Sequence, residues 1–192
     1  MTNKKAKAGA SDIAKGVAGC LTIIVIIFIV LAVIIASSGG HDEKKAPATV
    51  KAADESIHKV EPAEAQLWIT ADLASNWDGD AYIGKSGMVL TEIGKAIKAG
   101  AKDVPAKIET VHVTYTVPAT DRLGNPDRMR FMLVSVPIAD LRNANYDGLG
   151  PFGVLNLASE VSVYGIDPTE AVDKYCRDNA DDMRGFCAQA LR

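Results

Sequence analysis

Residues 108–136 read IETVHVTYTVPATDRLGNPDRMRFMLVSV, and this stretch decides the fold class. In its first part, apolar residues alternate with polar ones: Val111, Val113, Tyr115 and Val117 against Thr110, His112, Thr114 and Thr116. Strict alternation predicts a strand with one face on a core. After a turn-rich connection, Met129, Phe131 and Leu133 alternate with Arg128 and Arg130 and are expected to share one face. The two strands are expected to pair as an antiparallel hairpin, with both arginines at its more exposed end.

Helical patterns precede this hairpin. Residues 62–77 open with Pro62, which favours a helix start, although the LWIT segment inside them could equally begin a strand. Residues 76–87 are rich in Gly and Asp and are expected to form a loop. Residues 88–100 then carry apolar residues at helical spacing and end at a glycine, which predicts a helix with a glycine cap.

The segments after the hairpin are less regular. Residues 139–145 are expected to form a short helix and residues 146–153 a loop, whereas residues 154–164 fit either strand pieces or a helical turn. The sequence Asp-Pro-Thr-Glu at residues 167–170 predicts a helix start with a capping aspartate. Residues 62–192 therefore predict a small α+β domain with helices packed on one side of an antiparallel hairpin.

Cys176 and Cys187 are the two cysteines of this domain, and in an oxidising compartment such a pair is usually bridged. In one straight helix their sulfur atoms would lie about 16 Å apart, too far for a bond. We therefore expect a disulfide between them and a break near Asn179 that folds the C-terminus into a helical hairpin. The alternative is two buried thiols in a cytoplasmic domain, which would reverse the membrane topology.

Residues 17–36 read VAGCLTIIVIIFIVLAVIIA and contain no charged residue. As a helix they would be about 30 Å long, which matches the hydrocarbon core of a bilayer. They predict a single-pass transmembrane signal-anchor. Residues 1–16 carry four lysines and one aspartate, so the positive-inside rule predicts a cytoplasmic basic head and an extracytoplasmic (periplasmic) domain at the inner or plasma membrane. Residues 37–61, poor in large apolar side chains, are expected to be a flexible linker.

Three processing alternatives compete with the plain anchor. Small residues before Gly39 would suit cleavage of a signal peptide, but the apolar run is longer than such peptides usually carry. A lipoprotein reading of the residues before Cys20 fails because the apolar region follows the cysteine. A prepilin reading of Lys15-Gly16 lacks the glutamate expected at the position of Leu21.

Two motifs match binding sites only in part. Residues 79–86 satisfy the Walker A pattern of a phosphate-binding loop, but the residues before them make a poor strand end, so a glycine-rich turn is the better interpretation. Asn143, Asn145, Asp147 and Gly148 resemble the opening of a calcium loop, but its twelfth position is Val154 instead of glutamate. An Asx-rich surface turn is expected there.

The remaining polar groups do not form a recognisable site. Asp78 and Asp80 are neighbouring loop aspartates without an obvious catalytic partner. His41, His58 and His112 lie far apart in the sequence, and solvated or surface positions are expected for the last two. We therefore expect no catalytic residues, no cofactor and no metal site.

The net charge of −3 gives no electrostatic footprint for nucleic acid. An anchor, a linker and a domain without a site motif favour a non-enzymatic accessory or interaction subunit of a cell-envelope membrane complex. Its expected partners are the lipid bilayer and other subunits, through protein–protein interaction. The alternatives are a membrane-anchored extracytoplasmic enzyme or ligand-binding domain, and a membrane-active phage-type protein such as a holin or exclusion factor.

Overall fold

A computed structural model describes residues 47–74 and 79–192. The predicted basic head (1–16), the predicted span (17–36) and residues 37–46 of the predicted linker lie outside the described residues. Within the described ranges, no helix is both long and apolar enough to cross a bilayer. The described residues all belong to one compact unit.

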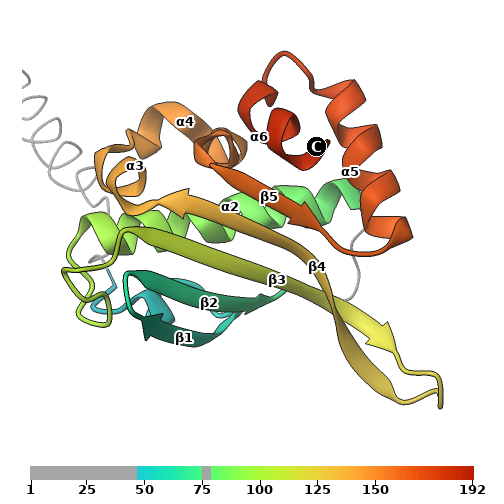
Figure 1. The fold of residues 1–192 in the computed structure, drawn as a ribbon, viewed down its shortest axis with the longest axis horizontal. Coiled ribbons are helices and arrows are strands. Elements are labelled where there is room, and N and C mark those ends of the chain that lie inside the picture. Colours follow the sequence, from blue (N-terminus) through green and yellow to red (C-terminus); the bar gives the residue numbers. More distant parts are fainter. Residues whose placement is uncertain (1–46, 75–78) are drawn as a thin grey trace, which may run out of the picture. The chain divides into compact units, whose positions relative to one another are not determined.

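One five-stranded sheet forms the first layer of this unit (Figure 1). Its strands follow each other across the sheet in chain order: β1 (Ile57–Ala63), β2 (Gln66–Asp72), β3 (Thr110–Thr120), β4 (Pro126–Pro137) and β5 (Glu160–Val163). β2 and β3 run parallel, and the other neighbours are antiparallel. Since parallel neighbours need a crossover, helix α2 (Gly79–Lys98) connects them. The predicted α+β fold is confirmed, and β3 and β4 are the predicted hairpin.

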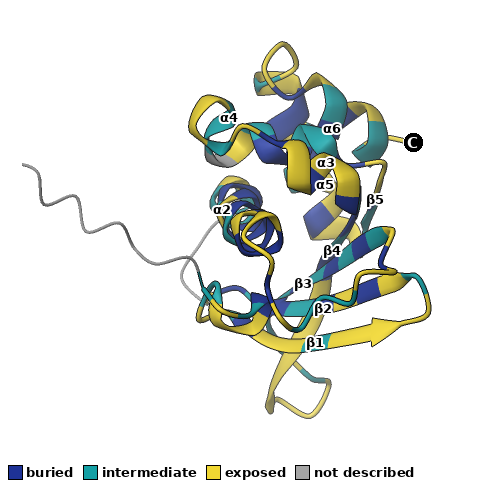
Figure 2. Cartoon of the chain, turned by 90° about the vertical axis from the view of Figure 1, so that its left-hand side faces the viewer, coloured by how far each residue is buried: buried dark blue, intermediate teal, exposed yellow. Residues whose placement is uncertain are grey.

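Helices form the second layer and cover one face of the sheet (Figure 2). Besides α2 they are η1 (Val50–Ala52), α3 (Ile138–Asn143), α4 (Tyr146–Gly153), η2 (Val154–Leu157), α5 (Ile166–Asp178) and α6 (Arg184–Ala190). The core lies between the two layers and is built from fully buried side chains such as Leu67, Val113, Tyr115 and Leu90. Helices on one side of the sheet, as predicted, leave its opposite face without a described helix.

Helix α2 begins earlier than expected. The helix predicted from residue 88 onward is confirmed, but residues 79–87, expected as a loop, are its first turns. The glycines that suggested a loop lie where other helices approach closely: a Cβ on Gly84 would come within 2.9 Å of the Phe152 ring on α4, and one on Gly79 would overlap Ala171 on α5. These glycines serve helix packing, which a loop-like composition does not reveal.

A β-bulge in β4 changes which side chains face the core. Tyr115 pairs with Met132 and Thr116 with Arg130, so Phe131 has no partner on β3. Because of this extra residue, Phe131 and Met132 are both buried, and Leu133 moves to the face opposite the helices. The expectation that Leu133 shares a face with Met129 and Phe131 is therefore wrong.

The folded unit also starts before the predicted boundary at residue 62. Residues 50–61, expected as linker, include η1 and most of β1, with Val50 and Ile57 buried. Asp103 holds this segment through hydrogen bonds from the backbone amides of Val50 and Lys51, at 2.8 and 3.1 Å. For the LWIT segment the strand alternative is correct, because β2 contains it.

The C-terminal region differs from the prediction in two places. Residues 146–153, expected as a loop, form α4, which is kinked at Gly150. The ambiguous residues 154–164 supply both η2 and β5. Gly165, and not Asp167, is the N-cap of α5, and Asp167 lies in the first turn.

The predicted disulfide is confirmed. Cys176 on α5 is bonded to Cys187 on α6, with their Cα atoms 5.6 Å apart. Helix α5 has its C-cap at Asn179, and α6 starts at Arg184, so the expected helical hairpin is present. The bridge therefore fastens the last helix to the one before it.

The β3–β4 hairpin extends beyond the rest of the sheet (Figure 1). β2 pairs with β3 only as far as Thr116, and β5 pairs with β4 only from Met132 onward. We call residues 117–130, which have no other strand beside them, the arm. Arg128 holds its base: it donates to the carbonyl oxygens of Leu73 and Thr116, at 2.8 and 2.9 Å, and forms an ion pair with Asp72.

Candidate functional site

The sheet face opposite the helices carries an aromatic row. Trp68, His112 and Ser135 lie side by side on β2, β3 and β4, because the strand registers pair Trp68 with His112 and His112 with Ser135. We call this side of the sheet, with Thr70, Thr114 and Leu133 on the neighbouring row, the open face. Figure 2 shows it on the side away from all the labelled helices.

The open face holds its aromatic side chains in fixed positions. The Trp68 and His112 rings are stacked, with centroids 4.2 Å apart and planes inclined by 16°. Nδ1 of His112 lies 2.9 Å from the hydroxyl oxygen of Ser135. Desolvation lowers the pKa of His112, and the opposing effect of Glu160 does not reverse this, so the imidazole is neutral at physiological pH. The two aromatic side chains of the row are therefore uncharged, and Glu61 on β1 and Glu160 on β5 pair with its two ends, Trp68 and Ser135.

The His112–Ser135 contact does not have the properties of a hydrolytic site. Ser135 is only 2% exposed, so its hydroxyl is closed to substrate. Nε2 of His112 is buried and has no hydrogen-bond partner within the described residues, so no carboxylate orients the ring. A nucleophile needs an accessible oxygen and a base positioned by a third group. The contact between His112 and Ser135 has neither of these features.

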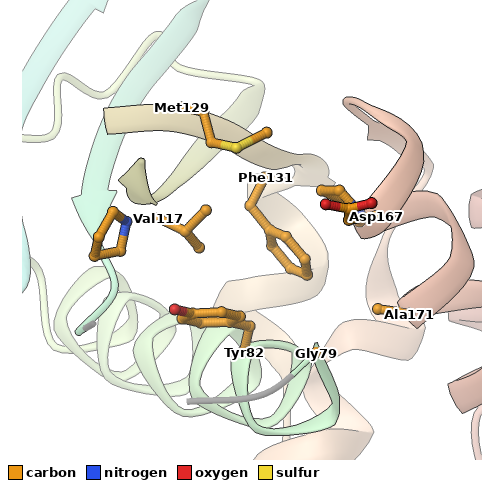
Figure 3. A pocket seen from close by; sticks show the side chains of 9 residues that line it. Gly79, Tyr82, Val117, Met129, Phe131, Asp167 and Ala171 are labelled. Atoms are coloured by element: carbon orange, nitrogen blue, oxygen red, sulfur yellow. The ribbon is translucent and has the colours of Figure 1, made fainter. Parts of the chain in front are cut away.

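A second feature is a cavity at the base of the arm, which we call the arm pocket (Figure 3). Its volume is about 230 Å³, and it lies between α2, the hairpin and the start of α5. It is lined by Gly79, Tyr82, Val117, Pro118, Met129, Phe131, Asp167, Pro168 and Ala171. Most of these side chains are apolar, so the arm pocket suits a small apolar group.

The bulge and the helix packing create this pocket. The extra residue in β4 turns Phe131 toward the helices, where its ring lies 5.6 Å from that of Tyr82 on α2. Figure 3 shows Asp167 on one side of the cavity and Val117 on the other, with the two aromatic rings between them. Asp167 is the single acidic lining residue and forms no ion pair within the described part of the chain.

The Walker-like residues do not form a phosphate loop. All of residues 79–86 belong to α2, so their backbone amides cannot surround a phosphate. Lys85 forms an ion pair with Asp54 at 3.2 Å, and the hydroxyl of Ser86 donates to the carbonyl of Tyr82. Burial works to raise the pKa of Asp54, but hydrogen bonds from Ser56 and Lys85 outweigh it and keep that pKa below its usual value. Lys85 is therefore a structural residue.

The calcium-like residues are also separated by the fold. Asn143 ends α3, Asn145 precedes α4, and Asp147 and Gly148 lie inside α4, so no continuous loop joins them. Across residues 47–74 and 79–192, no group of three or more histidine, cysteine or acidic residues is placed to hold a metal ion.

The other polar candidates lie apart. Asp80 is exposed and forms an ion pair with Lys174 at 3.0 Å, whereas Asp78 and His41 lie outside the described residues. His58 belongs to β1 and lies 3.4 Å from Asp72, so it is not part of a linker. His112 is stacked and partly buried, which corrects the expectation of a simply solvated ring.

Sequence reasoning missed both the open face and the arm pocket. The only signal for the first was that His112 lies on the polar side of an alternating strand. The pocket depends on a bulge and on helices from distant parts of the chain. In comparisons with known proteins, no family model, no curated protein and no solved structure matches this chain.

Proposed function

We propose that this chain is a single-pass, membrane-anchored, non-enzymatic interaction subunit of a cell-envelope complex, and that its open face binds another subunit. One observation carries the proposal: Trp68 on β2 is 38% exposed, and it lies on the sheet face that no described helix covers. Tryptophan is among the residues most enriched in the energetic hot spots of protein interfaces. A partner would remove this indole from water.

The surroundings of Trp68 favour binding because they are already ordered. The stack with His112 and the contact between His112 and Ser135 fix the aromatic row before any partner arrives. Side chains that are fixed in advance lose little rotamer entropy on association. The neutral imidazole also costs less to desolvate than a charged one. Threonines on the next row, Thr70 and Thr114, offer hydroxyl groups to a partner.

The membrane part of the proposal is supported by the sequence of residues 17–36, whose length and lack of charge match a bilayer. The lysines of residues 1–16 favour a cytoplasmic N-terminus and a periplasmic domain. An anchored domain searches for its partner in two dimensions and at a high effective concentration. A modest interface on the open face is then sufficient.

The proposal is tested by site-specific photo-crosslinking of the full-length chain in intact cells. A photoreactive phenylalanine analogue replaces Thr70 on the open face, and in a matched control it replaces Arg142, an exposed residue of α3 on the helical side. We expect irradiation to join the Thr70 position to a different protein of defined mass, which mass spectrometry identifies. The Arg142 position should not give this adduct.

A substitution then connects the adduct to the indole. Trp68→Ala should reduce the yield of the Thr70 adduct at least about tenfold, as expected for a hot-spot tryptophan. Leu191→Ala is the control, because Leu191 is also an exposed apolar residue, at 53%, but lies near the C-terminus. An adduct yield that is unchanged by Trp68→Ala, or equal at both photoreactive positions, would contradict binding through the open face.

A further inference from the structure

The tip of the arm presents an isolated apolar side chain. Leu123 is 78% exposed, the most exposed of the large apolar residues in the described part of the chain. It lies in the turn between β3 and β4, at the far end of the arm from the sheet (Figure 1). An exposed leucine alone is common on protein surfaces. The structure of the turn and its relation to the arm pocket make this one informative.

The turn that carries Leu123 is held by hydrogen bonds to Asp121. The carboxylate of Asp121 accepts hydrogen bonds from the backbone amides of Leu123 and Asn125, both at 2.8 Å, and from the side chain of Asn125 at 3.0 Å. These bonds lower the pKa of Asp121, and those from Asn125 have the largest effect. The Asp121 carboxyl group is therefore ionised at neutral pH. Gly124 completes the turn with a φ of +86°, a conformation that glycine adopts without strain. Leu123 is thus held out before it meets any partner.

The arm keeps this leucine away from the arm pocket of its own chain. The ladder runs without interruption from the pair Val117–Met129, which lines the pocket, to the pair Thr120–Pro126 next to the turn. Three further rungs at about 3.3 Å each, together with the turn, separate the tip from the base. Leu123, which we call the knob, and the arm pocket therefore lie at opposite ends of the same hairpin.

We propose that two copies of this chain associate through their arms, with Leu123 of each copy in the arm pocket of the other. If two arms lie side by side in opposite directions, the tip of each meets the base of the other. When a two-fold axis passes through the middle of the two arms, each Leu123 enters the pocket of the other copy. Two-fold symmetry is also the symmetry of most homodimers. The interface is closed, because each copy contributes one knob and one pocket.

The size of the pocket fits this occupant. An apolar cavity of about 150 Å³ is enough to hold a benzene ring, which is larger than the isobutyl group of leucine. The arm pocket, at about 230 Å³, therefore accepts a leucine side chain together with part of the adjoining turn. Met129 at its rim is flexible and adapts to the shape of what enters.

The charges are complementary too. Arg122 precedes the knob and is exposed, and Asp167 lines the pocket. Neither forms an ion pair within residues 47–74 and 79–192. The exchange of arms brings Arg122 of one copy to Asp167 of the other. Opposite charges at this point fix the register of the two arms.

Disulfide trapping in native membranes tests the geometry. The full-length chain carries Cys20→Ser, which removes the cysteine outside the disulfide, together with Leu123→Cys and Ala171→Cys. Mild oxidation should give a covalent dimer. Each single cysteine variant should give no covalent dimer, because in antiparallel arms the two tips lie far apart, and so do the two pockets. Leu123→Cys with Arg142→Cys, on α3 away from the pocket, is the matched control and should not cross-link. Cross-linking of the Leu123→Cys single variant would overturn the antiparallel arrangement.

Affinity measurements test the two contacts separately. In sedimentation experiments on the full-length protein in mild detergent, Leu123→Asp should raise the dimer dissociation constant roughly 100-fold, since two buried leucines are lost per dimer, while Leu123→Met should keep it close to wild type. Arg122→Glu and Asp167→Arg should each weaken the dimer, and the two together should restore it. A monomeric wild-type protein, or no rescue in the double variant, would overturn the proposal.

The same experiments keep this inference separate from the proposed function. Leu123→Asp removes self-association but leaves the open face intact, so it should not change the yield of the Thr70 adduct with a different protein. Trp68→Ala should lower the yield of the Thr70 adduct and leave self-association unchanged. Because Leu123 is almost fully exposed, its substitutions do not disturb the core, and a far-ultraviolet circular dichroism spectrum confirms that the fold is kept.

Discussion

The hydroxyl group of Tyr115 on β3 donates a hydrogen bond of 2.9 Å to the backbone carbonyl of Ser86 on α2. Both residues are fully buried, at 0% exposure, so this bond joins the two layers of the domain through its core. Burial also raises the pKa of Tyr115, so the phenol keeps its proton and remains a donor.

Tyr115→Phe removes this bond and keeps the ring. We expect it to lower the free energy of unfolding by about 1 kcal/mol, because the replacement leaves a buried carbonyl with one partner fewer. Urea denaturation of the full-length protein measures the change. Tyr164→Phe is the control, since the Tyr164 hydroxyl makes no hydrogen bond within the described residues, and it should change stability by much less. Equal effects of the two substitutions would contradict a role for the bond.

Gly94→Ala should destabilise the contact between α2 and α4. A Cβ at this position would overlap the hydroxyl of Tyr146, which itself donates to the carbonyl of Leu141. Overpacking of this kind costs about 1–3 kcal/mol, which thermal unfolding measures. Gly153→Ala is the matched control: its Cβ would meet Leu149 only at 3.4 Å, an ordinary contact. If Tyr146 is the obstacle, adding Tyr146→Ala should make Gly94→Ala nearly harmless.

Reduction of the bond between Cys176 and Cys187 should lower the free energy of unfolding by roughly 2–3 kcal/mol, because the bond restricts the unfolded chain. The effect is no larger because the loop that the bond closes is short. The melting temperature of the wild-type protein should therefore fall in the presence of a reductant. A Cys176→Ala, Cys187→Ala variant should melt at the lower temperature with or without reductant. A Cys20→Ser variant should behave like the wild type, and no sensitivity in the wild type would contradict the disulfide.

The stability of the protein should depend on the protonation of His112. Its pKa is lower in the folded state than the usual 6.5, so below about pH 6.5 the unfolded state binds more protons than the folded one. The free energy of unfolding should therefore decrease as the pH falls through this region. In His112→Gln this contribution is absent. His58→Gln retains His112 and should keep it, so denaturant titrations of the three proteins between pH 5 and 8 isolate the effect of this one ring.

Thiol labelling locates the domain. If it is periplasmic, as we propose, an impermeant maleimide should modify Cys176 and Cys187 in intact cells only after reduction. Arg142→Cys, an exposed position, should react without reductant and shows that the reagent has access. Labelling of Arg142→Cys only after lysis would place the domain in the cytoplasm and contradict the proposed topology.

Local patterns were sufficient for part of this fold. The alternation around Tyr115 predicted β3 and its core-facing side, and the spacing of Cys176 and Cys187 predicted a helical break with a disulfide. In both cases the signal lies within about a dozen neighbouring residues. The first turns of α2 were predicted to be a loop because glycines such as Gly79 and Gly84 are typical of loops. In the structure, these two glycines permit close contact with Ala171 and Phe152, far along the chain.

The candidate sites depend even more on distant residues. The arm pocket exists because Phe131 is an extra residue in β4, and no pattern in residues 128–136 shows where a bulge will fall. The row from Trp68 to Ser135 depends on the register of three strands, of which only β3 and β4 are adjacent in the sequence. Surfaces and cavities that are assembled from register and packing cannot be predicted from composition.

The parallel pairing of β2 with β3 also determines the order in which the domain can assemble. The hairpins β1–β2 and β3–β4 close locally, but β2 reaches β3 only after α2 has crossed the sheet. Contacts that span such a long connection form slowly, because the entropy of the whole loop must be lost first. We therefore expect two hairpins to form early and to join in the rate-limiting step. Until then, the apolar side of each hairpin is exposed to water and prone to aggregation. The newly made chain is protected only once α2 packs on both hairpins.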